Sequence, residues 1–246
     1  MKVLGIDIGG SGIKGAIVDT ETGELVTERH RIPTPRPATP KNIAKTIKAI
    51  VDHFEWKGKA GCGFPTPLSH GKCLSGSNLH KSLEGVQIDE LFKEATGIDF
   101  TVINDADAAA LAEFKFGAGK GKDGLVAVIT LGTGIGSGLF FNGNLIPNTE
   151  LGHLSYKDAP FEKYAADSIR KIEGLSYKKW GKRLNKYFKH VKLILSPDLV
   201  IIGGGASKKL DKFKNELTVD LNIIPAENKN EAGIIGAALA AEEGIK

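Results

Sequence analysis

A glycine-rich turn near the start of the sequence has the residue types that hold a phosphate group. It contains Gly9, Gly10, Ser11 and Gly12, and Asp7 stands just before it. Glycine leaves the backbone N–H groups bare and the φ angle unrestricted, so successive N–H groups can form a concave nest for an anion. Asp7 is placed to hold Mg²⁺ through water, because hard cations prefer carboxylate oxygens. For this turn alone, a tight hairpin with an incidental carboxylate remains the alternative.

Two further turns repeat these properties. The second contains Gly132, Thr133 and Gly134, and the third contains Gly203, Gly204 and Gly205. The first two turns each join two apolar stretches of strand type, so they differ from Walker A loops and Rossmann turns, which lead into a helix. The third turn lies between an apolar strand and a helix, where bare glycines let a nucleotide base and ribose approach the backbone. Three such turns in one chain favour a protein that binds phosphate groups.

Positive charge is concentrated between Arg170 and Lys192. This segment holds nine basic residues and one acid, so it carries +8, while the rest of the chain sums to −4. Apolar residues at helical spacing predict a helix over residues 176–195, and four lysines share its opposite face: Lys178, Lys182, Lys186 and Lys189. A row of ammonium groups suits a linear polyanion, and a merely solvated face remains the alternative.

The elements that position these residues follow from periodicity and turn signals. Strands are predicted over residues 2–8, 12–19 and 24–31, followed by a Pro-rich extended connection over residues 32–40. A helix over residues 40–54, a strand ending at Gly63, a helix over 89–96, a strand over 100–103 and a helix over 105–116 come next. The pattern then restarts with strands over 124–131 and 136–141, and continues with the helix over 176–195, a strand over 199–202 and a helix from about 230. Such a repeat favours an α/β protein with two lobes.

Composition excludes several classes of protein. The 246 residues contain 41% apolar and 25% charged residues, which excludes a wholly disordered or fibrous chain. No apolar run approaches the roughly 20 residues that span a bilayer, and Asp7 interrupts the region where a signal peptide is apolar. We therefore expect a cytoplasmic protein with no membrane partner. Two cysteines, Cys62 and Cys73, cannot build a disulfide framework.

The three turns, in this order and spacing, resemble the superfamily of sugar kinases, heat-shock chaperones and actin, and more narrowly the ROK family of sugar kinases. Residues 104–110, Asn-Asp-Ala-Asp-Ala-Ala-Ala, are similar to that family's Asn-Asp-Ala-Asn-Ala-Ala segment, and residues 150–153 to its Glu-x-Gly-His. The resemblance implies a two-lobed actin-like (ribonuclease H-like) ATPase fold with a cleft between the lobes. It places residues 1–105 and about 232–246 in a small lobe and residues 106–231 in a large lobe, and it implies a homodimer.

One departure from the family pattern bears on metal binding. Typical members follow Gly-His with a cysteine-rich zinc motif, and no cysteine follows Cys73 here, so no zinc site is expected. Glu162, in the sequence Asp-Ala-Pro-Phe-Glu, is the candidate substitute for the sugar contact that depends on that motif. Residues 78–85, 174–180, 185–191 and 196–199 resemble the zinc-free members of the family that use polyphosphate as donor.

The resemblance implies a role for each matching residue. Asp105 is the candidate general base, although capping of the following helix is the alternative for an Asp there. The implied sugar ligands are polar groups able to pair with hydroxyls: Asn78, Asn104, Asp105, Glu150, His153 and Glu162. The glycine-rich turns are the implied phosphate and nucleotide sites, and Lys14 either adds a cation there or is solvated.

The implied reaction is phosphorylation of glucose at its 6-hydroxyl with inorganic polyphosphate, with Mg²⁺ as cofactor. The third turn keeps ATP open as a second donor. A strictly ATP-dependent hexokinase acting on glucose or mannose is the alternative within the family. A repressor is disfavoured because the first hairpin begins almost at residue 1. A nucleic-acid binder is disfavoured because no aromatic side chains interleave with the lysines of the predicted helix.

Overall fold

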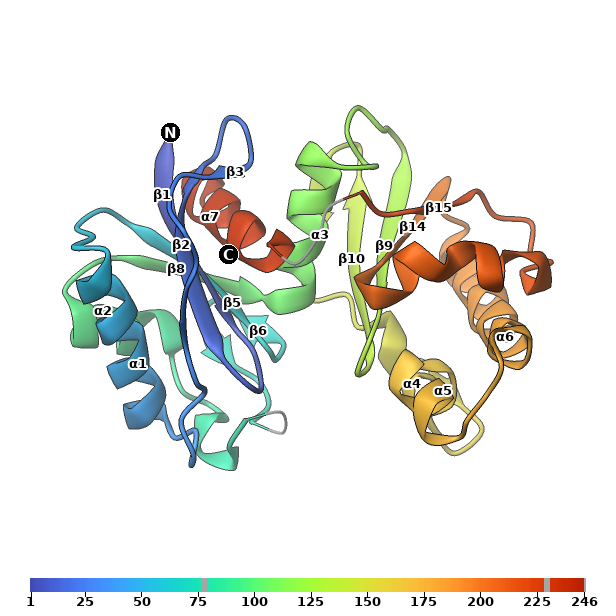
Figure 1. The fold of residues 1–246 in the computed structure, drawn as a ribbon, viewed down its shortest axis with the longest axis horizontal. Coiled ribbons are helices and arrows are strands. Elements are labelled where there is room, and N and C mark those ends of the chain that lie inside the picture. Colours follow the sequence, from blue (N-terminus) through green and yellow to red (C-terminus); the bar gives the residue numbers. More distant parts are fainter. Residues whose placement is uncertain (77–78, 228–230, 246) are drawn as a thin grey trace. The chain divides into compact units, whose positions relative to one another are not determined.

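The computed structural model describes residues 1–76, 79–227 and 231–245. The chain forms two compact units, one of Met1–Ala112 with Asn230–Lys246 and the other of Glu113–Lys229 (Figure 1). The first division lies inside helix α3 (Asp105–Phe116) rather than before residue 106. The start of α3 belongs to the first unit because it packs there: a Cβ on Gly236 would lie 1.6 Å from the Ala108 carbonyl oxygen. The first unit, predicted to be the smaller, is the longer of the two.

The first unit is built on a mixed sheet. Its strands are β1 (Lys2–Ile8), β2 (Ile13–Asp19), β3 (Glu24–Leu25), β4 (His30–Ile32), β5 (Ala60–Phe64) and β8 (Phe100–Asn104). The order is β3-β2-β1-β5-β8, with β4 also paired to β2; β1, β5 and β8 run parallel and β2 antiparallel to β1. The prediction of one strand over residues 24–31 was wrong. Here the Ile17 N–H bonds the Thr27 hydroxyl, which interrupts the ladder between β3 and β4.

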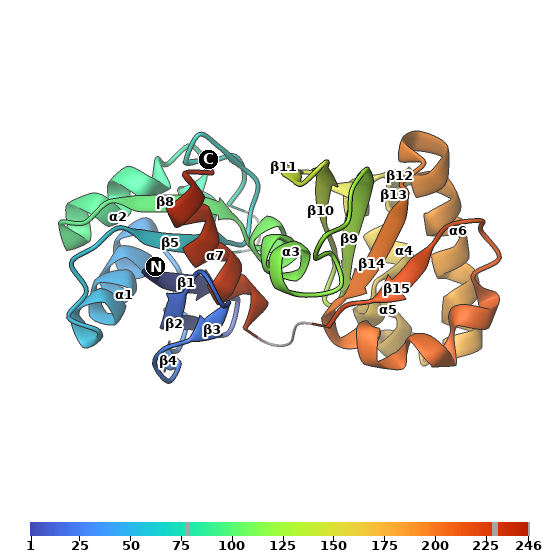
Figure 2. The same ribbon diagram turned by 90° about the horizontal axis from the view of Figure 1, so that it is seen from above.

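Helices cover both faces of this sheet (Figures 1 and 2). Helices α1 (Pro40–His53) and α2 (Ile88–Thr96) pack on one face, and α7 (Ala232–Glu243) packs on the other. Thr39 caps α1 and Pro40 opens it, as helix N-termini prefer. Glycine lets α7 approach the strands closely, since a Cβ on Gly61 would lie 1.7 Å from the Ala237 carbonyl oxygen. The unit also contains β6 (Leu68–Ser69), β7 (Lys72–Cys73) and the 3-10 helix η1 (Lys81–Leu83).

The second unit repeats the strand pattern. Its sheet has the order β11-β10-β9-β14-β15, formed by β9 (Leu125–Leu131), β10 (Ile135–Phe141), β11 (Asn144–Ile146), β14 (Leu199–Gly203) and β15 (Ile223–Pro225). Strands β9 and β10 form an antiparallel hairpin, while β9, β14 and β15 run parallel. A small hairpin of β12 (Ser155–Tyr156) and β13 (Ala159–Pro160) lies outside the sheet. The predicted repetition of two strands around a glycine-rich turn is therefore confirmed.

Helix α6 (Tyr177–Leu195) supplies much of the second unit's core. Ser176 caps it, and Trp180, Leu184, Tyr187 and Phe188 are fully buried, as the helical spacing predicted. The shorter helices are α4 (Glu162–Ala165), α5 (Asp167–Ile172) and the 3-10 helices η2 (Leu151–His153), η3 (Gly204–Lys212) and η4 (Lys214–Glu216). Among the helices described, none combines the length and apolar character needed to cross a membrane.

Candidate active site

The first glycine-rich turn joins β1 to β2 and leaves backbone donors unused. The Gly9 N–H bonds the Gly12 carbonyl at 3.0 Å, which closes the hairpin. Within the described residues, the N–H groups of Gly10, Ser11 and Gly12 have no hydrogen-bond partner. Three successive unpaired N–H groups are the arrangement that binds an anion. Just before the turn, the Asp7 carboxylate lies 3.3 Å from the Lys14 ammonium group, so this lysine is engaged with Asp7.

One glycine in each of the three turns has no structural reason to be glycine. A Cβ added to Gly10, Gly132 or Gly205 would meet no atom within 4 Å, and none of these residues has a positive φ angle. By contrast, Gly204 has a φ of 73° and a Cβ there would lie 2.9 Å from the Leu131 carbonyl oxygen. Glycine at the three open positions therefore fits close approach by a ligand to the backbone.

The parallel strands of the first unit bring Asp7 and Asp105 to one edge of the sheet. Asp7 lies near the carboxyl end of β1, and Asp105 directly follows the end of β8. Between them, at the end of β5, a Cβ on Gly63 would lie 3.6 Å from the Asp105 Cα. Gly233 of α7 packs against the Asp7 carboxylate, since a Cβ on Gly233 would lie 3.2 Å from that carboxylate. Sequence reasoning did not identify Gly63 or Gly233 as site residues, because only the sheet order and the packing of α7 bring them here.

The cap of α3 is Asn104 rather than Asp105. The Asn104 side-chain oxygen accepts hydrogen bonds from the N–H groups of Ala106 at 2.8 Å and Asp107 at 3.2 Å. This overturns helix capping as the explanation of Asp105, which is the first residue of α3 and is only partly buried. Asn104 is buried, and capping occupies its oxygen, so its NH₂ group is the part left for a sugar hydroxyl.

The second unit brings the other two glycine-rich turns together. Thr130 and Gly203 pair in the parallel register of β9 and β14, so the hairpin at residues 132–134 and the turn at 203–205 lie at the same edge of the sheet. Ser168 fixes the hairpin, since its N–H bonds the Gly132 carbonyl at 3.0 Å and its hydroxyl bonds the Thr133 carbonyl at 2.6 Å. In the described part of the chain, the N–H groups of Thr133 and Gly134 have no partner.

Three of the predicted sugar ligands form one cluster in the second unit. His153 lies between two carboxylates, with its Nδ1 at 3.9 Å from Glu150 and its Nε2 at 4.0 Å from Glu162. Burial raises the pKa of Glu150; His153 opposes this shift and the Glu162 carboxylate adds to it. Glu162 also accepts a hydrogen bond from the Ile135 N–H at 3.4 Å. Its carboxylate lies 2.3 Å from the Cβ position of Gly134, which places this cluster beside the second hairpin.

The structure bears only in part on two further predictions, the sugar ligand Asn78 and the binding of a metal ion. Asn78, a predicted sugar ligand, lies outside the described residues. Within the described part of the chain, no group of three or more His, Cys, Asp or Glu side chains has the arrangement of a metal site.

The four lysines of the α6 row have no acidic partner in the described part of the chain, whereas four other basic residues of the segment do. Arg170 and Lys171 both pair with Asp167, Arg183 pairs with Glu173, and Lys192 pairs with Asp220. No ion pair to any described residue involves the four lysines of the row, all of which are exposed: Lys178, Lys182, Lys186 and Lys189. Lys186 also lies 5.9 Å from the centre of the Tyr164 ring. The four charges are thus available to an external anion.

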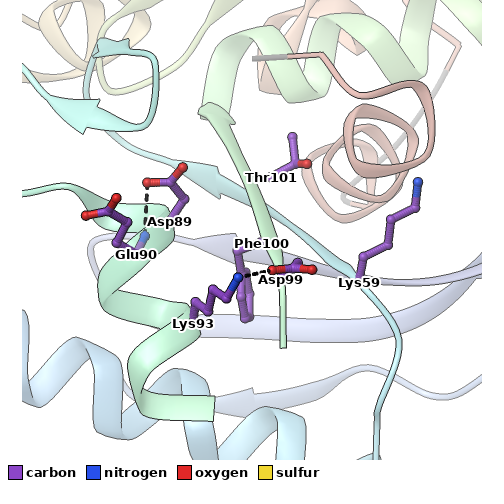
Figure 3. Close-up of a pocket in the computed structure, with 7 residues that line it drawn as sticks. All are labelled: Lys59, Asp89, Glu90, Lys93, Asp99, Phe100 and Thr101. Atoms are coloured by element: carbon purple, nitrogen blue, oxygen red, sulfur yellow. Dashed lines mark hydrogen bonds and ion pairs between the residues drawn. The ribbon is translucent and has the colours of Figure 1, made fainter. Parts of the chain in front are cut away.

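A pocket of about 340 Å³ in the first unit shares no residue with this site. Figure 3 shows its lining, in which Lys93 and Asp99 form an ion pair at 2.8 Å and Asp89 accepts from the Glu90 N–H. The pocket lies at the beginning of α2 and of β8, whereas Asp7 and Asp105 lie at the carboxyl ends of their strands. Its acids and bases largely neutralise one another, and it contributes nothing to the candidate site.

Comparison with known proteins gives consistent matches. The ROK family model matches residues 3–167. Over 238 residues, 96% of this chain and 90% of the relative, the sequence is 45% identical to a polyphosphate glucokinase of Mycobacterium tuberculosis (strain CDC 1551 / Oshkosh). A polyphosphate glucokinase of Mycobacterium leprae is 41% identical over 96% of this chain and 74% of its own length.

Solved structures agree with these sequence matches. The inorganic polyphosphate/ATP-glucomannokinase of Arthrobacter sp. strain KM superposes with a TM-score of 0.91 over 99% of each chain, at 44% identity. A ROK family glucokinase from Streptomyces griseus, solved with glucose and AMPPNP, has a TM-score of 0.82 at 22% identity over 99% of this chain and 100% of that one. The second match supports the fold alone.

Proposed function

Because this chain belongs to the ROK family, we propose that it is a kinase that transfers a phosphoryl group from inorganic polyphosphate to the 6-hydroxyl of glucose. The observation that carries a phosphoryl-transfer function is the pair of glycine hairpins whose N–H groups are unpaired among the described residues. Each hairpin lies beside the carboxyl ends of parallel strands, together with acidic side chains. Phosphoryl transfer depends on positioning and charge neutralisation, and hairpins of this kind supply both.

Asp105 is the proposed general base. In the transfer step the 6-oxygen of glucose forms a bond to the terminal phosphorus of the donor, and the bond from that phosphorus to the bridging oxygen breaks. The hydroxyl proton passes to the Asp105 carboxylate, and the shortened donor leaves with the bridging oxygen and its electron pair. A carboxylate at the start of a helix, whose cap is already provided by Asn104, is suited to this role.

Each unit by itself offers polar side chains that we propose as ligands for glucose hydroxyls. Asn104 contributes its amide, and Glu150, His153 and Glu162 contribute the cluster described above. Two carboxylates and an imidazole can accept and donate hydrogen bonds to several hydroxyls, which an apolar pocket cannot do. Asn78 completes the proposed set on the resemblance alone.

The residues around the first hairpin fit a divalent cation. Asp7 is partly exposed, keeps a carboxylate beside the unpaired N–H groups, and offers the oxygen ligands that Mg²⁺ prefers. Asp7, through water, and the donor phosphates would hold the ion, which neutralises phosphate charge when bound. Lys14 holds Asp7 in place at 3.3 Å and adds a second positive charge. No zinc site is part of the proposal.

Polyphosphate is the proposed main donor because the lysine row of α6 has no acidic partner in the described part of the chain. A linear polyanion can bind these exposed lysines without breaking an existing ion pair, and each lysine adds electrostatic attraction. ATP is the second donor in this proposal. The open backbone at Gly205, beside the second hairpin, favours it, since a ribose and base can approach there.

The test is formation of glucose 6-phosphate in two separate reactions with Mg²⁺. One contains long-chain polyphosphate and no nucleotide, and the other contains ATP and no polyphosphate. Product from polyphosphate supports the proposal, and product from ATP alone would replace it by a strictly ATP-dependent hexokinase. No product from either donor would refute a glucokinase. Mannose belongs in the same assay, because a solved relative is named a glucomannokinase.

A homodimer, expected from the family, remains a prediction. Light scattering of the purified protein would determine the mass of the particle in solution.

A further inference from the structure

The Pro-rich connection before α1 does more than join two elements. Two of its side chains, together with Arg31 of the preceding strand β4, donate hydrogen bonds to three successive carbonyl oxygens of the first hairpin: Thr34 Oγ1 to Gly9 at 2.5 Å, Arg36 Nη2 to Gly10 at 3.0 Å, and Arg31 Nη2 to Ser11 at 2.7 Å. We call Arg31, Thr34 and Arg36 the brace.

The brace determines where the hairpin's N–H groups point. In a trans peptide the carbonyl of one residue and the N–H of the next point in opposite directions. Because the carbonyls of Gly9, Gly10 and Ser11 are turned toward the brace, the next three N–H groups are turned away from it. These are the N–H groups of Gly10, Ser11 and Gly12, for which no partner exists among the described residues.

The brace is itself held at both ends. Upstream, β4 pairs with β2, and the register places Arg31 opposite Lys14. Downstream, the Asn42 side chain donates to the Pro37 carbonyl at 2.9 Å at the start of α1. Thr34, between these anchors, is 7% exposed. A hydroxyl buried in a fixed segment can hold a carbonyl in one orientation, whereas a mobile side chain cannot.

The Arg31 guanidinium group also lies directly against Gly12 of the hairpin. A Cβ on Gly12 would lie 2.5 Å from the Arg31 Nε and 2.7 Å from its Cζ, so the guanidinium group occupies the space of a side chain. The two guanidinium groups are charged donors, which polarise the peptide units they bind and make the opposite N–H groups stronger donors.

We propose that the brace positions the first hairpin for the phosphate chain of the donor, with Thr34 acting through the Gly9 carbonyl and the two arginines through the carbonyls of Gly10 and Ser11. This inference rests on the proposed function in one respect, namely that the hairpin binds the donor. The three side chains are positioning residues: they lie on the carbonyl side of the hairpin and hold the opposite side open.

The test uses inorganic tripolyphosphate as the probe, in the presence of Mg²⁺ and measured by calorimetry on the full-length protein. Thr34→Val keeps the shape of the side chain and removes the hydroxyl, whereas Thr34→Ser keeps the hydroxyl. Arg36→Met removes a charged donor from an exposed position. Arg29→Met is the matched control, because Arg29 is an exposed arginine two residues before Arg31 and is not among the side chains that donate to the hairpin carbonyls. Steady-state KM values for the donor and for glucose are measured alongside.

Thr34→Val is expected to weaken tripolyphosphate binding by about tenfold, because the partly buried Gly9 carbonyl would lose the one donor that it has among the described residues. The KM for the donor should rise in parallel, while the KM for glucose changes less than twofold. Thr34→Ser and Arg29→Met should bind as the wild type does, and Arg36→Met should weaken binding. If Thr34→Val fails to fold, the brace is tested by tripolyphosphate binding in Arg36→Met, which should be weakened, while Thr34→Ser should bind as the wild type does.

Unchanged tripolyphosphate binding in both Thr34→Val and Arg36→Met would overturn the brace, as would a wild-type protein that does not bind the probe. Equal rises in the two KM values would also overturn it, since they indicate general loosening. The proposed function fails separately, when the wild type makes no glucose 6-phosphate. Loss of probe binding in Thr34→Val would still uphold the brace in that case.

Discussion

Neutralising two lysines of α6 should weaken the use of polyphosphate and spare the use of ATP. The variant is Lys182→Gln/Lys186→Gln, which removes two positive charges and keeps side chains of similar length. Both lysines are exposed and neither has an acidic partner in the described part of the chain. The substitution therefore breaks no ion pair that stabilises the fold.

The magnitude follows from Coulomb's law. Two unit charges about 4 Å apart in water attract each other by about 1 kcal/mol. Losing two such contacts costs about 2 kcal/mol, which corresponds to a rise of about 30-fold in the KM for long-chain polyphosphate. Lys182→Gln alone should raise that KM about fivefold. The row from Lys178 to Lys189 spans about 16 Å along the helix, so short chains reach fewer of its charges and should be less affected.

The assay is glucose 6-phosphate formation with long-chain polyphosphate, tripolyphosphate and ATP in separate reactions at several salt concentrations. In the variant, the slope of log KM for polyphosphate against log salt should fall by about 1.4, since each lost phosphate contact contributes about 0.7 for a flexible strand. The thermal unfolding temperature should stay close to that of the wild type, because exposed substitutions of this kind change stability little.

Lys41→Gln/Lys45→Gln is the matched control. These lysines are also four residues apart and exposed, on α1 of the first unit, and the change in net charge is the same. If the control variant showed the same rise in the KM for polyphosphate, the rise would be due to the change in net charge and not to the position of the lysines on α6. Equal losses with ATP and polyphosphate, or a rise below threefold, would refute the reasoning and leave the lysine row as a solvated surface.

Four further outcomes are expected. Asp105→Asn should fold and bind glucose normally while kcat falls about 10²- to 10⁴-fold with either donor, and near-normal turnover would exclude Asp105 as the base. Gly132→Ala should keep the wild-type unfolding temperature, because its Cβ would meet no atom within 4 Å, but should raise the KM for the donor; unchanged donor kinetics would show that no ligand approaches there. Burial raises the pKa of Glu150 above its ordinary 4.5, so the stability it contributes is complete below about pH 4.5 and is lost as the pH rises through the raised pKa. Thermal melts should therefore show the wild type losing stability relative to Glu150→Gln across that interval. Tyr187→Phe should raise the free energy of unfolding by about 1 kcal/mol in urea titrations, because its buried hydroxyl has no hydrogen-bond partner among the described residues.

Much of the fold could be predicted from local pattern. Helix α3 begins and ends where the sequence predicted, and α6 buries the face that its apolar spacing indicated. These elements are long and strongly patterned, so their local preferences and their tertiary packing agree. The strand predicted over residues 24–31 was wrong because the Ile17 N–H of β2 bonds the Thr27 hydroxyl instead of a backbone carbonyl, a contact that the local β pattern does not reveal.

The candidate site likewise contains some features that the sequence predicts and others that only the structure shows. The three glycine-rich turns and the lysine row could be found in the sequence, because glycine clusters and a helical charge stripe are local signals. The roles of Thr34, Ser168 and Gly63 could not, since each depends on strand order or on a loop returning to a distant hairpin. Asn104 shows a finer limit. Asn and Asp at positions 104 and 105 are both good caps, and only the hydrogen bonds to Ala106 and Asp107 show that Asn104 caps the helix.

By itself, the sequence determined the residue types capable of chemistry and the elements that carry them, because composition and periodicity act over a few residues. The tertiary structure decided which glycines face open space, which lysines lack acidic partners, and which side chains hold the first hairpin. Those properties depend on atoms far apart in the chain: Arg31 reaches Ser11 across 20 residues, and Gly63 of β5 lies against Gly233 of α7. Local preferences carry no information about such contacts until the strands pair and the helices pack.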